Sequence, residues 1–571
     1  MSKKHQAKDI TIPSDYVMFM PSCSSFYAKT VSGKNKTRRM PEGLENGIDA
    51  LNYFNKDKGL FYYKYNLYSA GHAELDVEKS KEVEDIVWNR DPGTIVLGDS
   101  GGYQIASGIL NFDWSNPHSD ANNKMRERIL RWQEALCDLA MTLDIPTRAI
   151  ENDKATSIKG FDDCLDWTLI NLDWIMKNQN VESNTRILNV IQGLTWQGGK
   201  TKGGHEGGVK YWYEKVKKYN DVNLYGDRAF RGWAFGGSTA RNFATILKLL
   251  VLMRDDGFLT GRNNWIHVLG QTRLGAMVAL TEIQRAVRKT VKDSEFVISA
   301  DSASAFLSVA KGQGYFTDGL YSRNDYKLNL ENADDYVLEN REKVVDRFSY
   351  DMRWITDDKT LINNHEPWFC IDRDTGEKFV FDNTEIGRRL KNSDICVDDT
   401  PFREFEANSD KIRYDEIKAK PIEKLTDKDK TFIKQFDNKW SKYEQTIADL
   451  TDMGFPVDEV AEQKKFFQFE KKKEGKRTSW DTFSYALIMN HNVEVMVQSV
   501  MKAHELYDSN SDLLPEGLRN FKGFPEEVLS LPKKEAFKLI DKNRSWLGTM
   551  AGQVADRTLT ESEDDELVNF K

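Results

Sequence analysis

Short apolar runs alternate with helix-like segments through the first half of the chain. Eight apolar or β-branched runs cover residues 16–20, 61–68, 94–97, 139–143, 187–191, 233–235, 265–269 and 296–298. Between them, residues 125–136, 161–176, 240–253 and 274–287 show the spacing of amphipathic helices. Apolar runs separated by helices are typical of a parallel sheet covered on both faces. Eight such units in roughly 300 residues predict an α/β fold, a (β/α)8 TIM barrel. A doubly wound open sheet is the alternative.

The pattern changes after about residue 319. Residues 368–381 are typical of a β-hairpin with an Asp374-Thr375-Gly376 turn. From about residue 421 to 547 the chain is charged and mostly helical, with a long amphipathic stretch at 480–504. We therefore expect a barrel over 1–320, a mixed α+β segment over 321–420, a helical C-terminal domain over 421–556 and an acidic tail over 557–571.

Polar residues and glycines follow the apolar runs at a consistent place. Those at or just past the carboxyl end of a run are Asp99, Asp144, Gln192, Gly236, Gly237, Gly270 and Asp301. In a barrel, the carboxyl rim of the strands is where active sites are built. A single acid after a strand is equally well explained as a helix N-cap, but several strand ends of this kind favour a site.

The segment Gly98-Asp99-Ser100-Gly101-Gly102-Tyr103-Gln104 is the most informative of these strand ends. Its glycines allow close backbone approach, Tyr103 offers a stacking face and Asp99 can move a proton, an arrangement that suits a flat polar ring. Gly-Asp-Ser-Gly-Gly also surrounds the nucleophile of trypsin-like proteases. That alternative needs partner His and Asp residues in a β-rich chain, and the alternating helices argue against it.

Composition narrows the class of protein. The chain has 571 residues, 39% hydrophobic and 30% charged, which indicates a globular protein of two or three domains. We expect no membrane segment and no signal peptide, since no apolar run is long enough. The five scattered cysteines favour reduced thiols and a cytoplasmic protein, in a host cytoplasm if the chain is phage-encoded.

The net charge of -9 counts mildly against a nucleic-acid partner, but the charge is unevenly distributed. Residues 29–39 are basic, and 464–477 form a second basic cluster with interleaved phenylalanines. The cations of this second cluster that we consider candidates for nucleic-acid binding are Lys464, Lys465, Lys471, Lys472, Lys473 and Arg477. A solvated helix face is the alternative for both clusters.

In their order along the chain, these motifs resemble the tRNA-guanine transglycosylase family. The resemblance covers about residues 15–315 and rests on the segments 99–104 (DSGGYQ), 143–144 (LD), 191–193 (IQG), 232–237 (GWAFGG), 268–270 (VLG) and 299–302 (SADS). The first motif is quite specific. The others are short, and their order and their positions at strand ends reinforce it.

The resemblance implies a role for each residue in exchanging one purine-like base for another. Asp301 would attack the anomeric carbon of the nucleotide, and Asp99 would act as general acid and then general base, by the two-carboxylate logic of retaining glycosidases. In the base pocket, Asp144, Gln192, Gly236 and Gly237 would bind the edge of guanine or a 7-deazaguanine, while Tyr103 and Leu269 would enclose its faces. The alternatives are a helix cap for Asp144 and Asp301, a loop amide for Gln192 and a core aromatic for Tyr103.

The sequence departs from the tRNA enzymes in ways that suggest a branch of the family. The Cys-x-Cys-x-x-Cys zinc motif is missing, so we expect no metal, and the resemblance implies no cofactor. Ser238-Thr239-Ala240-Arg241 replaces the family's usual continuation with a glutamate, and the segment between Gly270 and Asp301 is long. With its large unrelated C-terminal part, the chain is most similar to the phage-type and bacterial enzymes that insert 7-deazaguanines, such as preQ0, into DNA.

The expected activity is therefore exchange of guanine in DNA for a 7-deazaguanine base. On DNA, the target guanine would have to leave the helical stack to reach a pocket on the barrel rim. Two alternatives remain open: the same chemistry on tRNA, and a catalytically silent subunit that binds nucleic acid.

Overall fold

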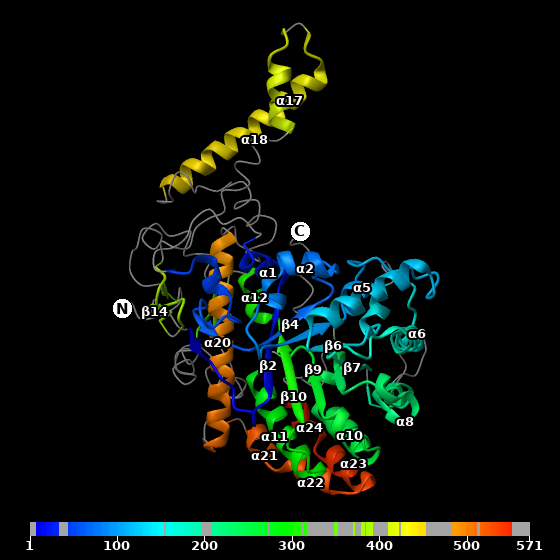
Figure 1. The fold of residues 1–571 in the computed structure, drawn as a ribbon. Coiled ribbons are helices and arrows are strands. Elements are labelled where there is room, and N and C mark those ends of the chain that lie inside the picture. Colours follow the sequence, from blue (N-terminus) through cyan, green and yellow to red (C-terminus); the bar gives the residue numbers. More distant parts are fainter. Residues whose placement is uncertain are drawn as a thin grey trace.

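A computed structural model of the chain describes residues 7–33, 44–152, 156–193, 195–196, 208–271, 273–310, 313–316, 348–351, 369–371, 378–382, 384–391, 409–421, 424–452, 482–510, 514 and 516–550. Its centre is a closed ring of eight parallel strands in the order β10-β2-β4-β5-β6-β7-β8-β9 (Figure 1). The strands are β2 (Met18–Cys23), β4 (Tyr65–Ser69), β5 (Ile95–Asp99), β6 (Leu139–Met141), β7 (Arg186–Ile191), β8 (Trp233–Phe235), β9 (Trp265–Val268) and β10 (Val297–Ser302). The (β/α)8 barrel predicted from the sequence is confirmed, and the closed ring excludes the open sheet.

The eight predicted runs each contribute one barrel strand, with small shifts of their ends. Run 61–68 divides into β3 (Phe61–Tyr62), which pairs with β1 (Lys8–Asp9) outside the barrel, and β4 inside it. The ring closes where β10 pairs with β2, in a register that sets Asp301 opposite Met20. This pairing joins residues about as far apart in the sequence as the barrel allows.

Helices surround the ring. They are α1 (Ser25–Val31), α2 (Val77–Val83), α3 (Asp85–Trp88), α4 (Gly102–Ala106), α5 (Asp120–Leu136), α6 (Phe161–Asn178), α7 (Val209–Val216), α8 (Val222–Tyr225), α9 (Gly237–Ala240), α10 (Phe243–Asp255), α11 (Leu274–Val291) and α12 (Ser304–Ala310). The described residues also form short 3-10 helices, which are η1 (Gly47–Leu51), η2 (Thr147–Glu151), η3 (Lys217–Asn220), η4 (Gly226–Arg228) and η5 (Gly261–Asn263). The four amphipathic segments predicted from the sequence correspond to α5, α6, α10 and α11.

Local capping explains where the long helices begin. The Ser119 hydroxyl accepts a hydrogen bond from the Asn122 amide at the start of α5, and the Asn242 side chain accepts one from the Thr245 amide at the start of α10. Such caps satisfy amide groups that have no partner within the helix. Between the strands and helices, a continuous core of aliphatic and aromatic side chains includes the fully buried Trp132, Trp212 and Trp233.

The C-terminal helices pack on the outside of the barrel. They are α20 (Thr482–Asp508), α21 (Glu516–Phe521), α22 (Phe524–Ser530), α23 (Lys533–Lys542) and α24 (Arg544–Met550). Helix α20 lies along α1, α11 and α12, while α22 and α23 lie against α11 and α10 (Figure 1). The helix predicted at 480–504 is present, but it is buried on nearly every face, because barrel helices and β11 contact it from several sides.

Two antiparallel strand pairs and a helical arm lie beyond the barrel. The predicted hairpin at 368–381 is present as the antiparallel pair β13 (Phe369–Ile371) and β14 (Lys378–Val380), and β11 (Gln313–Phe316) pairs with β12 (Phe348–Asp351) in the same way. Helices α17 (Ser409–Lys418) and α18 (Asp427–Asp452) extend away from the barrel as an arm (Figure 1). The turn at 374–376 and the tail at 557–571 lie outside the described residues.

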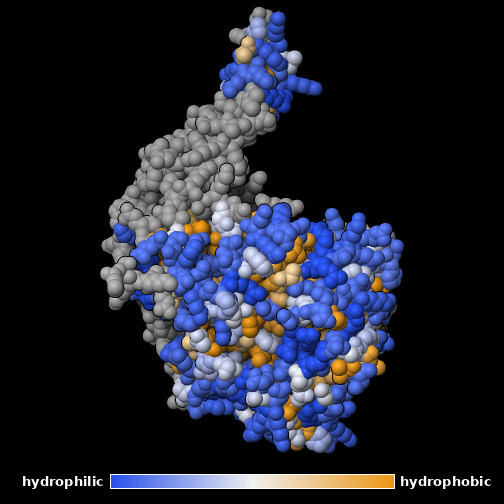
Figure 2. All heavy atoms as spheres, in the orientation of Figure 1, coloured by the Kyte–Doolittle hydropathy of each residue, from blue (hydrophilic) through white to orange (hydrophobic). Residues whose placement is uncertain are grey.

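The visible surface is mostly hydrophilic, with hydrophobic residues in small scattered groups (Figure 2). Across the part of the chain that the structure describes, none of the helices combines the length and the hydropathy of a membrane span.

Buried polar contacts tie α20 to the barrel, and they generate a first prediction. The fully buried Asn490 side chain donates to the Tyr27 hydroxyl at 2.9 Å and to the Leu51 carbonyl at 3.1 Å. Replacing Asn490 by alanine leaves both acceptors short of a donor, so we expect a loss of about 1–3 kcal/mol in the free energy of unfolding. Urea denaturation measures it. Lys502→Ala, at an exposed position of the same helix, should change stability by less than about 0.5 kcal/mol. Equal effects from the two variants would contradict the docking of α20.

Candidate active site

The barrel brings the polar residues predicted from the sequence to one rim. Asp99 is the last residue of β5, Asp301 lies near the end of β10, and Asp144 and Gln192 follow β6 and β7. Gly236 and Gly237 follow β8. Because all eight strands are parallel, their carboxyl ends meet on the same side of the ring. Residues that are about 200 positions apart in the sequence therefore face one site.

Asp99 is held by two donors at the mouth of the barrel. Its Oδ2 atom accepts a hydrogen bond from the Ser69 hydroxyl at 2.6 Å and one from the Gly101 amide at 3.3 Å. Ser69 pairs with Asp99 across β4 and β5, which places the hydroxyl beside the carboxylate. Burial of the carboxyl group raises the pKa of Asp99, and the charge of Asp301 adds to the rise, while the two donors oppose it. A carboxyl group of this kind is suited to proton transfer.

Asp144 and Gln192 form a buried pair. The Gln192 amide donates from Nε2 to Asp144 Oδ2 at 2.8 Å, and both residues are less than 10% exposed. Burial raises the pKa of Asp144 to about 7, and the charge of Asp99 adds to the rise, while the Gln192 hydrogen bond opposes it. Gln192 Oε1 is buried without a hydrogen-bond partner among the described residues. The pair thus presents a carboxylate and an unused amide oxygen, acceptors that match the N–H groups of a flat polar ligand.

Asp301 is anchored through one oxygen. Its Oδ1 atom accepts from the Gly270 amide at 2.8 Å and contacts His267 Nε2 at 3.2 Å. No hydrogen bond from the described residues reaches Oδ2. The Asp301 carbonyl also accepts the Gln271 amide at 2.8 Å, so the loop after β9 is fixed against β10. This geometry leaves one carboxylate oxygen available to react while the other stays bound.

The three carboxyl groups act on one another electrostatically. Asp301 raises the pKa of Asp99, and Asp99 in turn raises the pKa of Asp144, although the three groups lie at the ends of different strands. Like charges that share a site favour protonation of one of them. An ionised carboxylate next to a protonated one is the pairing that nucleophilic and general-acid catalysis needs at a glycosidic bond.

Three glycines lie so close to neighbouring atoms of the site that a side chain at their positions would collide with them. Gly101 has a positive φ of 74° at the start of α4, and a Cβ atom there would lie 2.8 Å from the Gly71 amide nitrogen. A Cβ on Gly236 would lie 2.5 Å from Gln192 Nε2, and one on Gly237 would lie 2.6 Å from Gln192 Oε1. A side chain at either position would push the Gln192 amide away from Asp144.

The two residues expected to enclose a base both lie at the rim. Tyr103 is on α4, and the Arg148 guanidinium is 5.3 Å from the centre of its ring. That distance is within the range of a cation–π contact. Leu269 directly follows β9, packs partly against the core, and donates its amide to the Phe235 carbonyl at 3.0 Å. A ligand stacked on Tyr103 would therefore share the ring with Arg148 or use its opposite face.

Sequence reasoning missed the residues that support the carboxylates. These residues are Ser69, His267 and Ser299, which belong to or adjoin runs that we interpreted as apolar. Ser69 hydrogen-bonds to Asp99, His267 contacts Asp301, and Ser299 contacts His267. A period-2 signal was present: His267 precedes Leu269 by two positions, and Ser299 precedes Asp301 by two. Residues two apart in a strand point to the same face.

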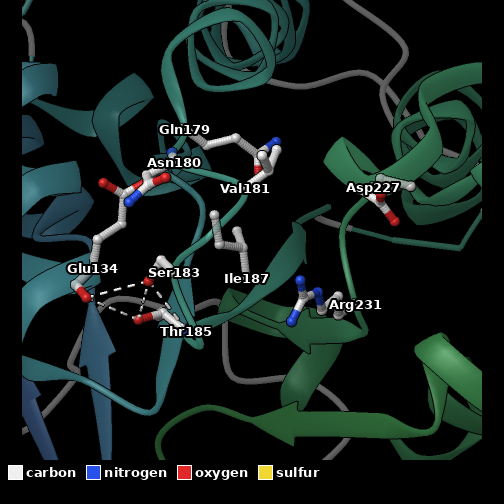
Figure 3. A pocket seen from close by; sticks show the side chains of 10 residues that line it. Glu134, Gln179, Asn180, Val181, Ser183, Thr185, Ile187, Asp227 and Arg231 are labelled. Atoms are coloured by element: carbon white, nitrogen blue, oxygen red, sulfur yellow. Dashed lines mark hydrogen bonds between the residues drawn. The ribbon is translucent and has the colours of Figure 1, made fainter.

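Other candidates lie elsewhere. The basic residues Lys464, Lys465, Lys471, Lys472, Lys473 and Arg477 are outside the described residues. A small pocket, lined among others by Glu134, Ser183 and Arg231, lies at the amino ends of β7 and β8, opposite the carboxylates (Figure 3). Within the described ranges, no group of three or more His, Cys, Asp or Glu side chains is placed to hold a metal ion.

The sequence was compared with protein-family models and with curated proteins. No protein-family model matches the chain, and no curated protein matches it either.

The raised pKa of Asp144 generates a prediction about stability. A carboxyl group with a pKa of 3.8 when unfolded and about 7 when folded destabilises the protein once it must ionise. This cost is absent below about pH 4, grows with pH and levels off above about pH 7. We expect Asp144→Asn, which keeps an acceptor for Gln192, to raise the free energy of unfolding by about 1–4 kcal/mol at pH 8.

Urea denaturation of both proteins at pH 4.5 and pH 8 measures the difference. The control is Asp166→Asn, at an exposed position of α6, which should leave the pH dependence unchanged. Parallel stability curves for the wild type and Asp144→Asn would contradict the buried, high-pKa carboxyl group.

Proposed function

We propose that the protein is a transglycosylase that exchanges guanine in DNA for a 7-deazaguanine base, such as preQ0 or a relative. The observation that carries the proposal is the group of three electrostatically coupled carboxyl groups on the barrel rim, Asp99, Asp144 and Asp301. Two of them suit the reaction at the sugar, and the third, paired with Gln192, suits recognition of the base.

In the first step, Asp301 Oδ2 attacks C1′ of the nucleotide as the bond from C1′ to the base breaks. The bonding electrons leave with guanine, and Asp99 supplies a proton to the departing base. The product is an ester between Asp301 and the sugar. In the second step, the incoming base gives a proton to Asp99 and attacks C1′, which breaks the ester and restores the Asp301 carboxylate.

Base recognition depends on matching donors and acceptors. Guanine and 7-deazaguanines present N1–H, an amine and a carbonyl oxygen along one edge. Asp144 would accept from the N–H groups when it is ionised, and a Gln192 N–H and the backbone amide near Gly237 would donate to the carbonyl. A site with buried polar groups rejects bases that leave those groups unpaired, because each unpaired group is costly. Tyr103 and Leu269 would cover the two faces of the ring.

The choice of DNA over tRNA rests on the sequence. The missing zinc motif and the long C-terminal part separate this chain from the tRNA enzymes that it resembles. A target guanine in duplex DNA would have to flip out of the stack to reach the rim.

Release of radiolabelled guanine from DNA and from tRNA, with a panel of 7-deazaguanine bases added, tests the proposal. We expect release from DNA alone. Asp301→Ala should abolish it, and Asp99→Asn should slow it by about 10²–10⁴-fold through loss of the general acid. Glu151→Gln, at an exposed carboxylate of η2 on the same rim, is the matched control and should retain the activity.

Other outcomes would contradict the proposal in distinct ways. Release from tRNA alone would assign the same chemistry to RNA. Binding of DNA without release from any substrate would identify a silent binding subunit. Exchange that persists in Asp301→Ala would show that the nucleophile is another residue.

A further inference from the structure

A chain of three hydrogen-bonded side chains ends on Asp301. The Trp265 indole N–H donates to the Ser299 hydroxyl oxygen at 2.9 Å, that hydroxyl lies 2.9 Å from His267 Nδ1, and His267 Nε2 lies 3.2 Å from Asp301 Oδ1. His267 and Ser299 are fully buried. We refer to Trp265, Ser299 and His267 as the relay.

The chemistry of its members fixes the direction of the two outer hydrogen bonds of the relay, and the direction of the third follows for an imidazole that carries one proton. An indole N–H can only donate, so the Ser299 oxygen accepts from Trp265. Asp301 Oδ1 accepts from His267, so Nε2 carries a proton. The Ser299 hydroxyl then donates to the lone pair of His267 Nδ1. The relay therefore matches the Nε2–H tautomer of the imidazole.

The strand geometry explains why these residues meet. Trp265 and His267 lie two apart on β9, and Ser299 and Asp301 lie two apart on β10, so each pair points to one face of its strand. The register of the parallel pair sets Ser299 directly opposite His267. At the outer end, the Arg186 guanidinium lies 5.6 Å from the Trp265 ring centre. The relay thus runs along the barrel and ends on the carboxylate at the rim.

We propose that His267, held by Ser299 and Trp265, is a positioning residue that selects which oxygen of Asp301 attacks the sugar. This inference rests on the function proposed above. With Oδ1 bound by His267 and Gly270, the carboxylate cannot rotate freely and Oδ2 is the oxygen left to attack the substrate. When Oδ2 forms the ester, Oδ1 becomes its carbonyl oxygen and keeps both donors. No proton moves along the relay in either step.

Substitutions of His267 that differ in where they place a donor test the proposal. A glutamine amide nitrogen reaches about as far as imidazole Nε2, whereas an asparagine amide nitrogen reaches only as far as Nδ1. In single-turnover base exchange on DNA we expect His267→Asn to lower the rate about 100-fold, as a misplaced reacting group does. His267→Gln should recover most of this loss. KM for the incoming base should change little, because Asp144 and Gln192 follow other strands, β6 and β7.

His504→Gln is the matched control. His504 is also buried and also pairs with a hydroxyl, at 2.6 Å from Thr281 Oγ1, but it is on α20 outside the barrel. This variant should lose stability and keep the wild-type rate when folded. Equal rates for His267→Asn and His267→Gln, or a change in KM alone, would overturn the positioning role.

A second measurement does not depend on activity. In protein labelled with ¹⁵N-histidine, the two ring nitrogen shifts report the tautomer, and His267→Gln identifies the signal by its loss. We expect a neutral Nε2–H imidazole whose Nε2 signal shifts in Asp301→Asn and whose Nδ1 signal shifts in Ser299→Ala. A charged ring or the Nδ1–H tautomer would overturn the relay. If the wild type exchanged no base but showed these shifts, the proposed function would fail while the relay to Asp301 stood.

Discussion

Pairing of β10 with β2 is the constraint on which the site depends. These hydrogen bonds close the ring and set Asp301 opposite Met20, and only in a closed ring does β10 return to the neighbourhood of β2, β4 and β5. Asp301 can then raise the pKa of Asp99, which lies on a strand about 200 residues earlier. Helix α20 braces this seam, because it contacts β2, α1, α11 and α12 together. The C-terminal helices are therefore part of what holds the rim in place.

The closed barrel also sets the electrostatic character of the site. Burial places carboxyl groups where ionisation is unfavourable, and neighbouring charges increase that cost. Hydrogen-bond donors offset part of it, from Ser69 to Asp99, from Gln192 to Asp144, and from Gly270 to Asp301. The barrel gives up stability to bury these acids, since the pKa values of Asp99 and Asp144 are raised. In the proposed mechanism, the raised pKa of Asp99 allows it to hold a proton while Asp301 attacks as a carboxylate.

Much of this arrangement could be predicted from the sequence, because short buried strands and the polar residues that follow them are local signals. The count of eight units also predicted a closed barrel, but the register that sets Asp301 opposite Met20 could not be predicted, since it depends on a pairing between distant strands. The burial of α20 on nearly every face could not be predicted from the sequence either, because it depends on the elements that pack around this helix. His267 stood inside a run that we interpreted as apolar and Ser299 directly followed another, and only the register of β9 and β10 brings them together.

The central claim is that Asp301 forms a covalent bond with the sugar. Its most direct test is mass spectrometry of the protein after incubation with a guanine-containing DNA oligonucleotide and removal of free guanine, followed by denaturation and digestion. We expect the peptide containing Asp301 to carry the mass of the oligonucleotide lacking one guanine, and the Asp301→Asn protein to carry none. An adduct on the peptide containing Asp99, or guanine release with no adduct on any peptide, would contradict it.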